Sequence, residues 1–108
     1  MRRLSLVTDI NNKLTDIPGA FLFGAHVSTQ ILLASGLRED KILCLLDNDP
    51  NKQSKRLYGT NLSVASPKIL ADVEKPVVIL RAGVYNKEIR EDILMNINSQ
   101  TVFLEADE

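Results

Sequence analysis

The segment Gly24-Ala25-His26 has the residue types of a strand–helix turn that could bind an anion. It follows an apolar run and precedes a helical pattern. A glycine turn there brings free backbone N–H groups and the positive end of a helix dipole to one point. The dinucleotide-binding fingerprint also needs glycine where His26 and Thr29 stand. The segment therefore predicts either a phosphate site of another kind or a simple turn.

Asp47 is the second candidate, because it ends an apolar run 23 residues after Gly24. In nucleotide-binding sheets a carboxylate near this offset accepts hydrogen bonds from ribose or sugar hydroxyls. Asp also forms turns beside Asn and Pro, so a structural role in Asp47-Asn48-Asp49-Pro50 is the alternative. Lys52, in the loop that follows, could contact a phosphate, and a solvated loop is the simpler interpretation.

Catalytic chemistry has little support in the residue pattern. His26 is the only histidine and the natural general base, but no nucleophile motif surrounds it. Cys44 lies within an apolar run, which predicts a buried and unreactive thiol. We therefore predict no catalytic residue and leave open whether the chain works as part of an enzyme.

Composition excludes several classes of function. The chain has 108 residues, a net charge of −1, one cysteine and one histidine. This length fits a single domain over 1–108, and one Cys with one His cannot build a tetrahedral zinc site of nitrogen and sulfur ligands. The near-neutral charge gives no general attraction to nucleic acids or membranes, and no apolar run approaches the ~20 residues of a membrane span. We expect a cytoplasmic domain that binds no metal, nucleic acid or membrane.

The elements that must position these residues alternate along the chain. Apolar strands are predicted at 20–23, 41–46, 76–80 and 101–104, and a short, half-exposed strand at 61–64, where polar and apolar residues alternate. Helices are predicted at 1–15, 26–35, 67–73 and 86–98. The third of these helices begins at Ser66-Pro67, with Ser as the N-cap and Pro at the first helical position.

This alternation predicts an α/β fold, a three-layer Rossmann-like sandwich whose mostly parallel sheet has about five strands and lies within 20–104. The predicted strand order is 3-2-1-4-5, with the topological switch point between strands 20–23 and 77–81. Ligands bind outside the carboxyl ends of such strands, which draws attention to 24–28, 47–53, 65–67 and 81–86.

An ordered set of motifs runs through the middle of the chain: Asp47-Asn48-Asp49-Pro50-Asn51-Lys52-Gln53, then Gly59-Thr60, then Val64-Ala65-Ser66-Pro67 and Leu70. The set resembles the C-terminal domain of sugar C-methyltransferases. There a strand ends in D-x-N-P-x-K-Q-G, continues to P-G-T-x-I-P-V and enters a helix through S-P-x-x-L. Phe23-Gly24-Ala25 is similar to the Y-G-A turn of that family, and Glu88-Ile89 to the E-I that opens its last helix. The resemblance covers about residues 20–98.

The resemblance implies a Rossmann-like domain that helps to hold a nucleotide-linked sugar, next to a zinc-binding module and an S-adenosylmethionine-binding domain. We therefore predict a ligand-binding domain that recognises a nucleotide-sugar or a similar anionic ligand and binds no cofactor by itself. A methyltransferase domain would be its partner. Within an enzyme, the resemblance implies an S-adenosylmethionine-dependent sugar methyltransferase. The predicted ligand-binding residues are Gly24, Ala25, His26, Asp47, Lys52 and Ser66.

The alternative is a structural domain without a ligand, which docks to a partner or self-associates as a dimer. Its candidate surface is the apolar stripe Leu4, Val7 and Ile10 on the first helix, which could cover either the sheet or a second protomer.

Overall fold

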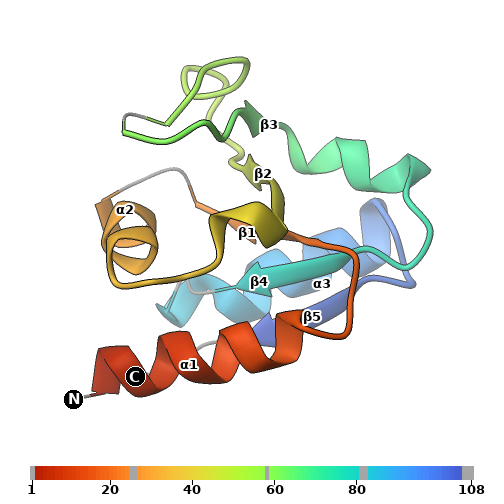
Figure 1. Cartoon of the computed structure of the whole chain (residues 1–108). Coiled ribbons are helices and arrows are strands. Elements are labelled where there is room, and N and C mark those ends of the chain that lie inside the picture. The colour runs from red at the N-terminus through yellow and green to blue at the C-terminus, as the bar shows by residue number, and fades with distance from the viewer. Residues whose placement is uncertain (1, 25–26, 58, 81–82, 106–108) are drawn as a thin grey trace.

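The computed structural model describes residues 2–24, 27–57, 59–80 and 83–105, and only the backbone of 2–6, 27–28, 83 and 105. Its main elements follow in the expected order (Figure 1): α1 (Arg2–Leu14), β1 (Ala20–Phe23), α2 (Val27–Ala34), β2 (Ile42–Leu46), β3 (Val64–Ala65), β4 (Val77–Leu80), α3 (Asn86–Asn96) and β5 (Val102–Glu105). Short 3-10 helices lie between them: η1 (Glu39–Lys41), η2 (Pro67–Asp72) and η3 (Gly83–Tyr85).

The described strands form one five-stranded sheet in the order β3-β2-β1-β4-β5, and every pair is parallel. This confirms the predicted α/β class and strand order. β1 and β4 are neighbours although β2 and β3 lie between them in the sequence. The sheet therefore grows outward in both directions from this pair, which makes the β1–β4 boundary the switch point.

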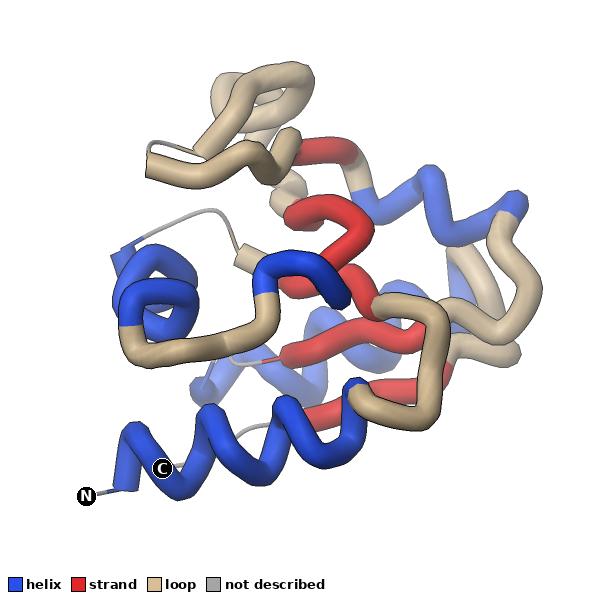
Figure 2. Tube along the Cα trace, in the orientation of Figure 1, coloured by secondary structure: helices blue, strands red, loops and turns tan. Residues whose placement is uncertain are grey.

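Alternate strand residues face two separate apolar clusters, one on each face of the sheet. Leu22 and Ile79 pack with Leu32 of α2, whereas Phe23 and Leu80 pack with Ile93 of α3. Figures 1 and 2 show α1 and α2 in front of the sheet and α3 behind it. The predicted three-layer arrangement is therefore confirmed.

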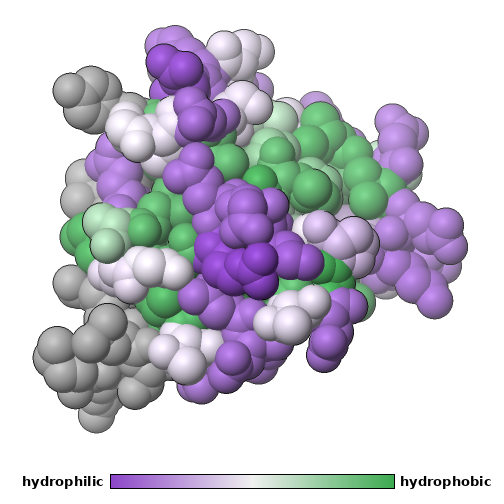
Figure 3. Space-filling model, in the orientation of Figure 1, coloured by the Kyte–Doolittle hydropathy of each residue, from purple (hydrophilic) through white to green (hydrophobic). Residues whose placement is uncertain are grey.

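The apolar stripe of α1 belongs to the front cluster. Val7 and Ile10 of the predicted stripe are buried there against the sheet together with Leu14, and the Leu4 side chain lies outside the described part of the structure. Of the two uses predicted for this stripe, covering the sheet is the one that these side chains perform. Elsewhere on this face, hydrophilic side chains gather over η1 (Figure 3).

The β3 edge of the sheet is closed by an element that the sequence pattern does not reveal. β3 has only two residues, but the loop before it pairs with it antiparallel. The Ser54 N–H donates to the Val64 carbonyl at 2.8 Å, and the Val64 N–H donates to the Lys55 carbonyl at 2.7 Å. A bridge between Arg56 and Ser63 continues the pairing. The loop after Asp47 is therefore a hairpin arm that protects the edge of β3.

Candidate functional site

The turn after β1 requires its glycine. Gly24 has a φ of 111°, which a residue with a Cβ rarely adopts. Its N–H donates to the Leu46 carbonyl at 2.7 Å, and its carbonyl accepts from Thr29 Oγ1 at 2.6 Å. These bonds turn the chain from β1 into α2. Ala25 and His26, also predicted as ligand-binding residues, lie outside the described residues.

Thr29 has a role that the sequence analysis missed. It occupies the third glycine position of the dinucleotide fingerprint, and its side chain is 2% exposed. Its hydroxyl closes the Gly24 turn from within the first turns of α2. The available signal was a hydroxyl residue five positions after the glycine, since such side chains bond nearby backbone groups.

Backbone hydrogen bonds bring the ends of three strands to the same edge of the sheet. The Gly24 N–H reaches Leu46, the last residue of β2, and the Asp47 N–H donates to the carbonyl of Ala65, the last residue of β3, at 3.1 Å. Gly24, Asp47 and Ser66 therefore follow neighbouring strands at the carboxyl edge, as the sequence predicts.

Asp47 serves as a turn former and lies beside a cation. Its side chain is 15% exposed, and its Oδ1 accepts from the Asp49 N–H at 2.9 Å. Lys52 Nζ lies 3.9 Å from its Oδ2, and Gln53 Nε2 donates to its main-chain carbonyl at 2.8 Å. The loop thus folds back on Asp47 and holds its carboxylate in place. The Lys52 side chain is 43% exposed, so such an ion pair adds at most about 1 kcal/mol of stability.

Ser66 is the N-cap of η2, as predicted. Its Oγ accepts from the Lys68 N–H at 3.2 Å, and Pro67 follows at the first helical position. The element it begins is a 3-10 helix rather than an α-helix. Ser66 also lines a pocket of about 260 Å³ between η2 and α3.

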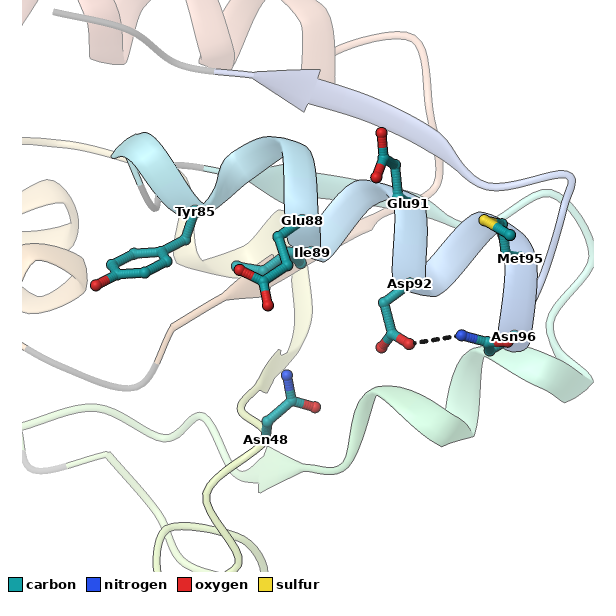
Figure 4. A pocket seen from close by; sticks show the side chains of 8 residues that line it. All are labelled: Asn48, Tyr85, Glu88, Ile89, Glu91, Asp92, Met95 and Asn96. Carbon is teal, nitrogen blue, oxygen red and sulfur yellow. Dashed lines mark hydrogen bonds between the residues drawn. The ribbon is translucent and has the colours of Figure 1, made fainter.

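A second pocket, of about 540 Å³, continues along α3 and is lined by the eight residues labelled in Figure 4. The two pockets share Asn48, Asp92 and Asn96, so they form one depression, which we call the α3 groove. Figure 4 shows Glu88 and Asp92 pointing from α3 toward Asn48. Sequence reasoning missed Asn48 as a lining residue, because its position depends on how β2, η2 and α3 come together.

Three carboxylates dominate the charge of the α3 groove. Glu88, Glu91 and Asp92 line it, and within the described part of the chain none of them forms an ion pair. Asn96 Nδ2 donates to Asp92 Oδ1 at 2.8 Å, and Lys68 adds one cation on the η2 side. Gly24, Asp47 and Lys52 line neither part of this groove. The acidic groove therefore lies beside these three residues without including them, and Asn48, next to Asp47, belongs to its lining.

Cys44 lies half-buried on the α3 face of the sheet. Its side chain packs against the rear cluster, and burial raises the pKa of its thiol above the ordinary value. A thiol that stays protonated is a poor nucleophile, in agreement with the predicted unreactive role. Over the ranges that the structure describes, no cluster of three His, Cys, Asp or Glu side chains is placed to hold a metal ion.

No helix in the described residues has the length and apolar character needed to cross a bilayer. The chain matches no protein-family model, no curated protein and no solved structure.

Proposed function

We propose that this chain is a ligand-binding domain that recognises a nucleotide-sugar, or a similar anionic hydroxylated molecule, at the carboxyl edge of its sheet. The observation that carries the proposal is the switch point between β1 and β4. The helices that follow these two strands lie on opposite faces of the sheet, and parallel sheets bind their ligands in the crevice that such a reversal leaves.

The electrostatics of the two helices decide which side of the crevice takes the anion. The first turn of α2 contains no acidic residue, so the positive end of its dipole is not neutralised there. The first turn of α3 contains Glu88, and two more carboxylates follow along the α3 groove. A phosphate therefore binds on the Gly24 side, away from α3.

The unit formed by Asp47 and Lys52 supplies the remaining polar contacts. Lys52 is partly exposed and offers its ammonium group to a phosphate, while the Asp47 carboxylate accepts from ribose or sugar hydroxyls. Because the two side chains are 3.9 Å apart, Lys52 offsets the charge with which Asp47 would otherwise repel an anionic ligand. Ser66 completes the predicted set at the end of β3, and Ala25 and His26 remain predictions from the sequence.

The resemblance to sugar C-methyltransferases supports the nucleotide-sugar as the ligand class. In that arrangement a separate S-adenosylmethionine-binding domain supplies the methyl group. We therefore assign substrate holding to this domain and no catalytic residue.

The test is an NMR titration of the full chain with a panel of nucleotide-sugars. The amide signals of Gly24, Asp47, Lys52 and Ser66 should shift and saturate together. Lys52→Gln should weaken the binding by about tenfold, the scale of one hydrogen bond to a charged group. Lys55→Gln, which removes an exposed lysine from the hairpin arm of the same loop, is the matched control and should leave the affinity unchanged. Unmoved signals across the whole panel would refute the proposal.

A further inference from the structure

We propose that the α3 groove is a docking site for a basic amphipathic helix of a partner protein. This second binding surface shares Ser66 with the ligand site proposed above but does not include Gly24, Asp47 or Lys52. The proposal rests on the shape, the exposed apolar side chains and the charge of the groove.

The α3 groove has the length of a short helix. Tyr85, the N-cap of α3, and Met95, near the end of α3, lie near its two ends and are ten residues apart. With a rise of about 1.5 Å per residue, this separation is about 15 Å, or nearly three helical turns. The smaller pocket between η2 and α3 extends the depression sideways, across Asn48. A helix of about three turns can therefore lie along α3 within one continuous depression.

Apolar side chains are exposed along this surface without a partner in the described structure. Tyr85 is 63% exposed and Met95 is 81% exposed, while Val84, just before them, is 89% exposed. Tyrosine and methionine are enriched at protein interfaces, and methionine adapts its shape to different partners. Because these lining side chains are so exposed, a small molecule in the groove would remain largely in solvent. A helix along α3 would cover Tyr85 and Met95 together.

The charge of the groove identifies the chemistry of the partner. Glu88, Glu91 and Asp92 provide three carboxylates, and Lys68 provides one cation at the η2 side. Such a surface repels nucleic acids and anionic membranes and attracts lysine and arginine. In Figure 4, Glu88 and Asp92 point toward Asn48, whereas Glu91 points away from Asn48. A basic helix resting here would contact Glu88 and Asp92.

A second copy of this chain does not offer a matching helix in its described part. Val7, Ile10 and Leu14 of α1 are buried against their own sheet, and α2 contains no charged residue. The exposed cations Lys55 and Arg56 belong to the hairpin arm that closes β3. Lys87 lies on α3 itself, whose carboxylates would face those of a second copy. The occupant is therefore a different protein segment.

The proposal is tested with synthetic peptides of about 14 residues, long enough for a helix to span the groove. The first peptide carries leucine at helical spacing on one face and lysine on the other. The second has the same composition in scrambled order, and the third has glutamate in place of lysine. In an NMR titration of the full chain, the first peptide should shift the amides of residues 84–96 and Asn48. The scrambled peptide should bind at least about tenfold more weakly, a difference of about 1.4 kcal/mol, and the glutamate peptide should not bind.

Matched charge variants separate the groove from the general charge of the protein. The triple variant Glu88→Gln, Glu91→Gln, Asp92→Asn should weaken binding of the lysine peptide by about tenfold or more, because it removes the charges that attract the lysine side chains. The control triple Asp9→Asn, Asp16→Asn, Asp40→Asn removes the same number of exposed charges elsewhere and should change the affinity by less than about twofold.

Equal binding of the ordered and scrambled peptides would overturn the proposal, as would equal weakening by the two triple variants. Shifts confined to another surface would do the same. Self-association that is abolished by the groove triple variant would assign the surface to a second copy of the chain, and would also overturn the proposal.

Discussion

The helices that follow the neighbouring strands β1 and β4 differ in charge and in exposed apolar surface. On the α2 side, the polar groups of the entering turn bond one another, through Gly24, Leu46 and Thr29. The α2 sequence contains no charged residue. On the α3 side, five charged residues occupy an eleven-residue helix, and apolar side chains remain open to solvent.

This difference separates two tasks that a strand–helix unit can perform. On the α2 side, the first turn of the helix has no acidic residue and Gly24 is held by hydrogen bonds, which suits a small anion. The α3 side is open and acidic, which suits a larger and positively charged partner. The experiments below test the comparison by changing one side at a time.

The largest effect is expected at Thr29, on the α2 side. Thr29→Val keeps the shape of the side chain but removes the hydroxyl that donates to the Gly24 carbonyl. Losing the donor to this buried group should lower the free energy of unfolding by about 1 to 3 kcal/mol. Thr29→Ser retains the hydroxyl and should recover most of that loss in denaturant unfolding. A Thr29→Val protein as stable as the original would show that the Gly24 turn does not depend on this bond.

The next effect is expected at Asn98, which holds the walls of the α3 groove together. Its Nδ2 donates to the carbonyls of Leu70 and Val73, each at 2.8 Å, and so ties the end of α3 to η2. Asn98→Ala should lower the free energy of unfolding by about 1 to 2 kcal/mol and shift the amide signals of η2. Asn96→Ala is the control, since the hydrogen bond that its side chain makes within the described ranges goes to the exposed Asp92. If both variants behave alike, the groove is not fixed by Asn98.

The strands were predictable because three of them are continuous apolar runs bounded by glycine, proline or aspartate. Their order is the one typical of Rossmann-like sheets, which the alternation of strands and helices predicts. The hairpin arm was not predictable, because Ser54, Lys55 and Arg56 are polar and the pairing with β3 runs through their backbone.

The register between β1 and β2 was not predictable either. β2 skips one residue between the partners of Ala20 and Phe21, which leaves Leu43 unpaired and 58% exposed.

The candidate site was predictable where its residues belong to a local turn. The turn-forming role of Asp47 and the capping role of Ser66 depend on neighbours two residues away, so the local sequence contains the signal. Asn48 and Asp92 are 44 residues apart and meet only because η2 and α3 pack on the same face of the sheet. No local pattern carries that information.

A smaller effect is expected from the titration of Cys44, on the α3 face. Burial raises the pKa of this thiol, so the unfolded chain loses its thiol proton at a lower pH than the folded protein does. Stability from this group is therefore complete below the ordinary pKa of about 9 and declines as the pH rises above it. Cys44→Ala should show a shallower decline between about pH 8 and pH 10 in denaturant unfolding. Parallel pH profiles would mean that the thiol titrates alike in both states.

The smallest effect on folding is expected at Met95. This variant tests whether an exposed side chain on the α3 side contributes to partner binding and not to the stability of the fold. Met95 is 81% exposed, so Met95→Ala should change the free energy of unfolding by less than about 0.5 kcal/mol. Ile93, two residues earlier on the same helix and 1% exposed, is the control. Ile93→Ala should lower the free energy of unfolding by about 2 to 5 kcal/mol.

The same Met95→Ala protein should bind the lysine peptide more weakly, because it loses apolar contact area in the complex alone. A loss of stability above about 1 kcal/mol would place Met95 among the packing residues of the fold. Unchanged stability with weakened binding would show that the exposed side chain serves a partner rather than the fold.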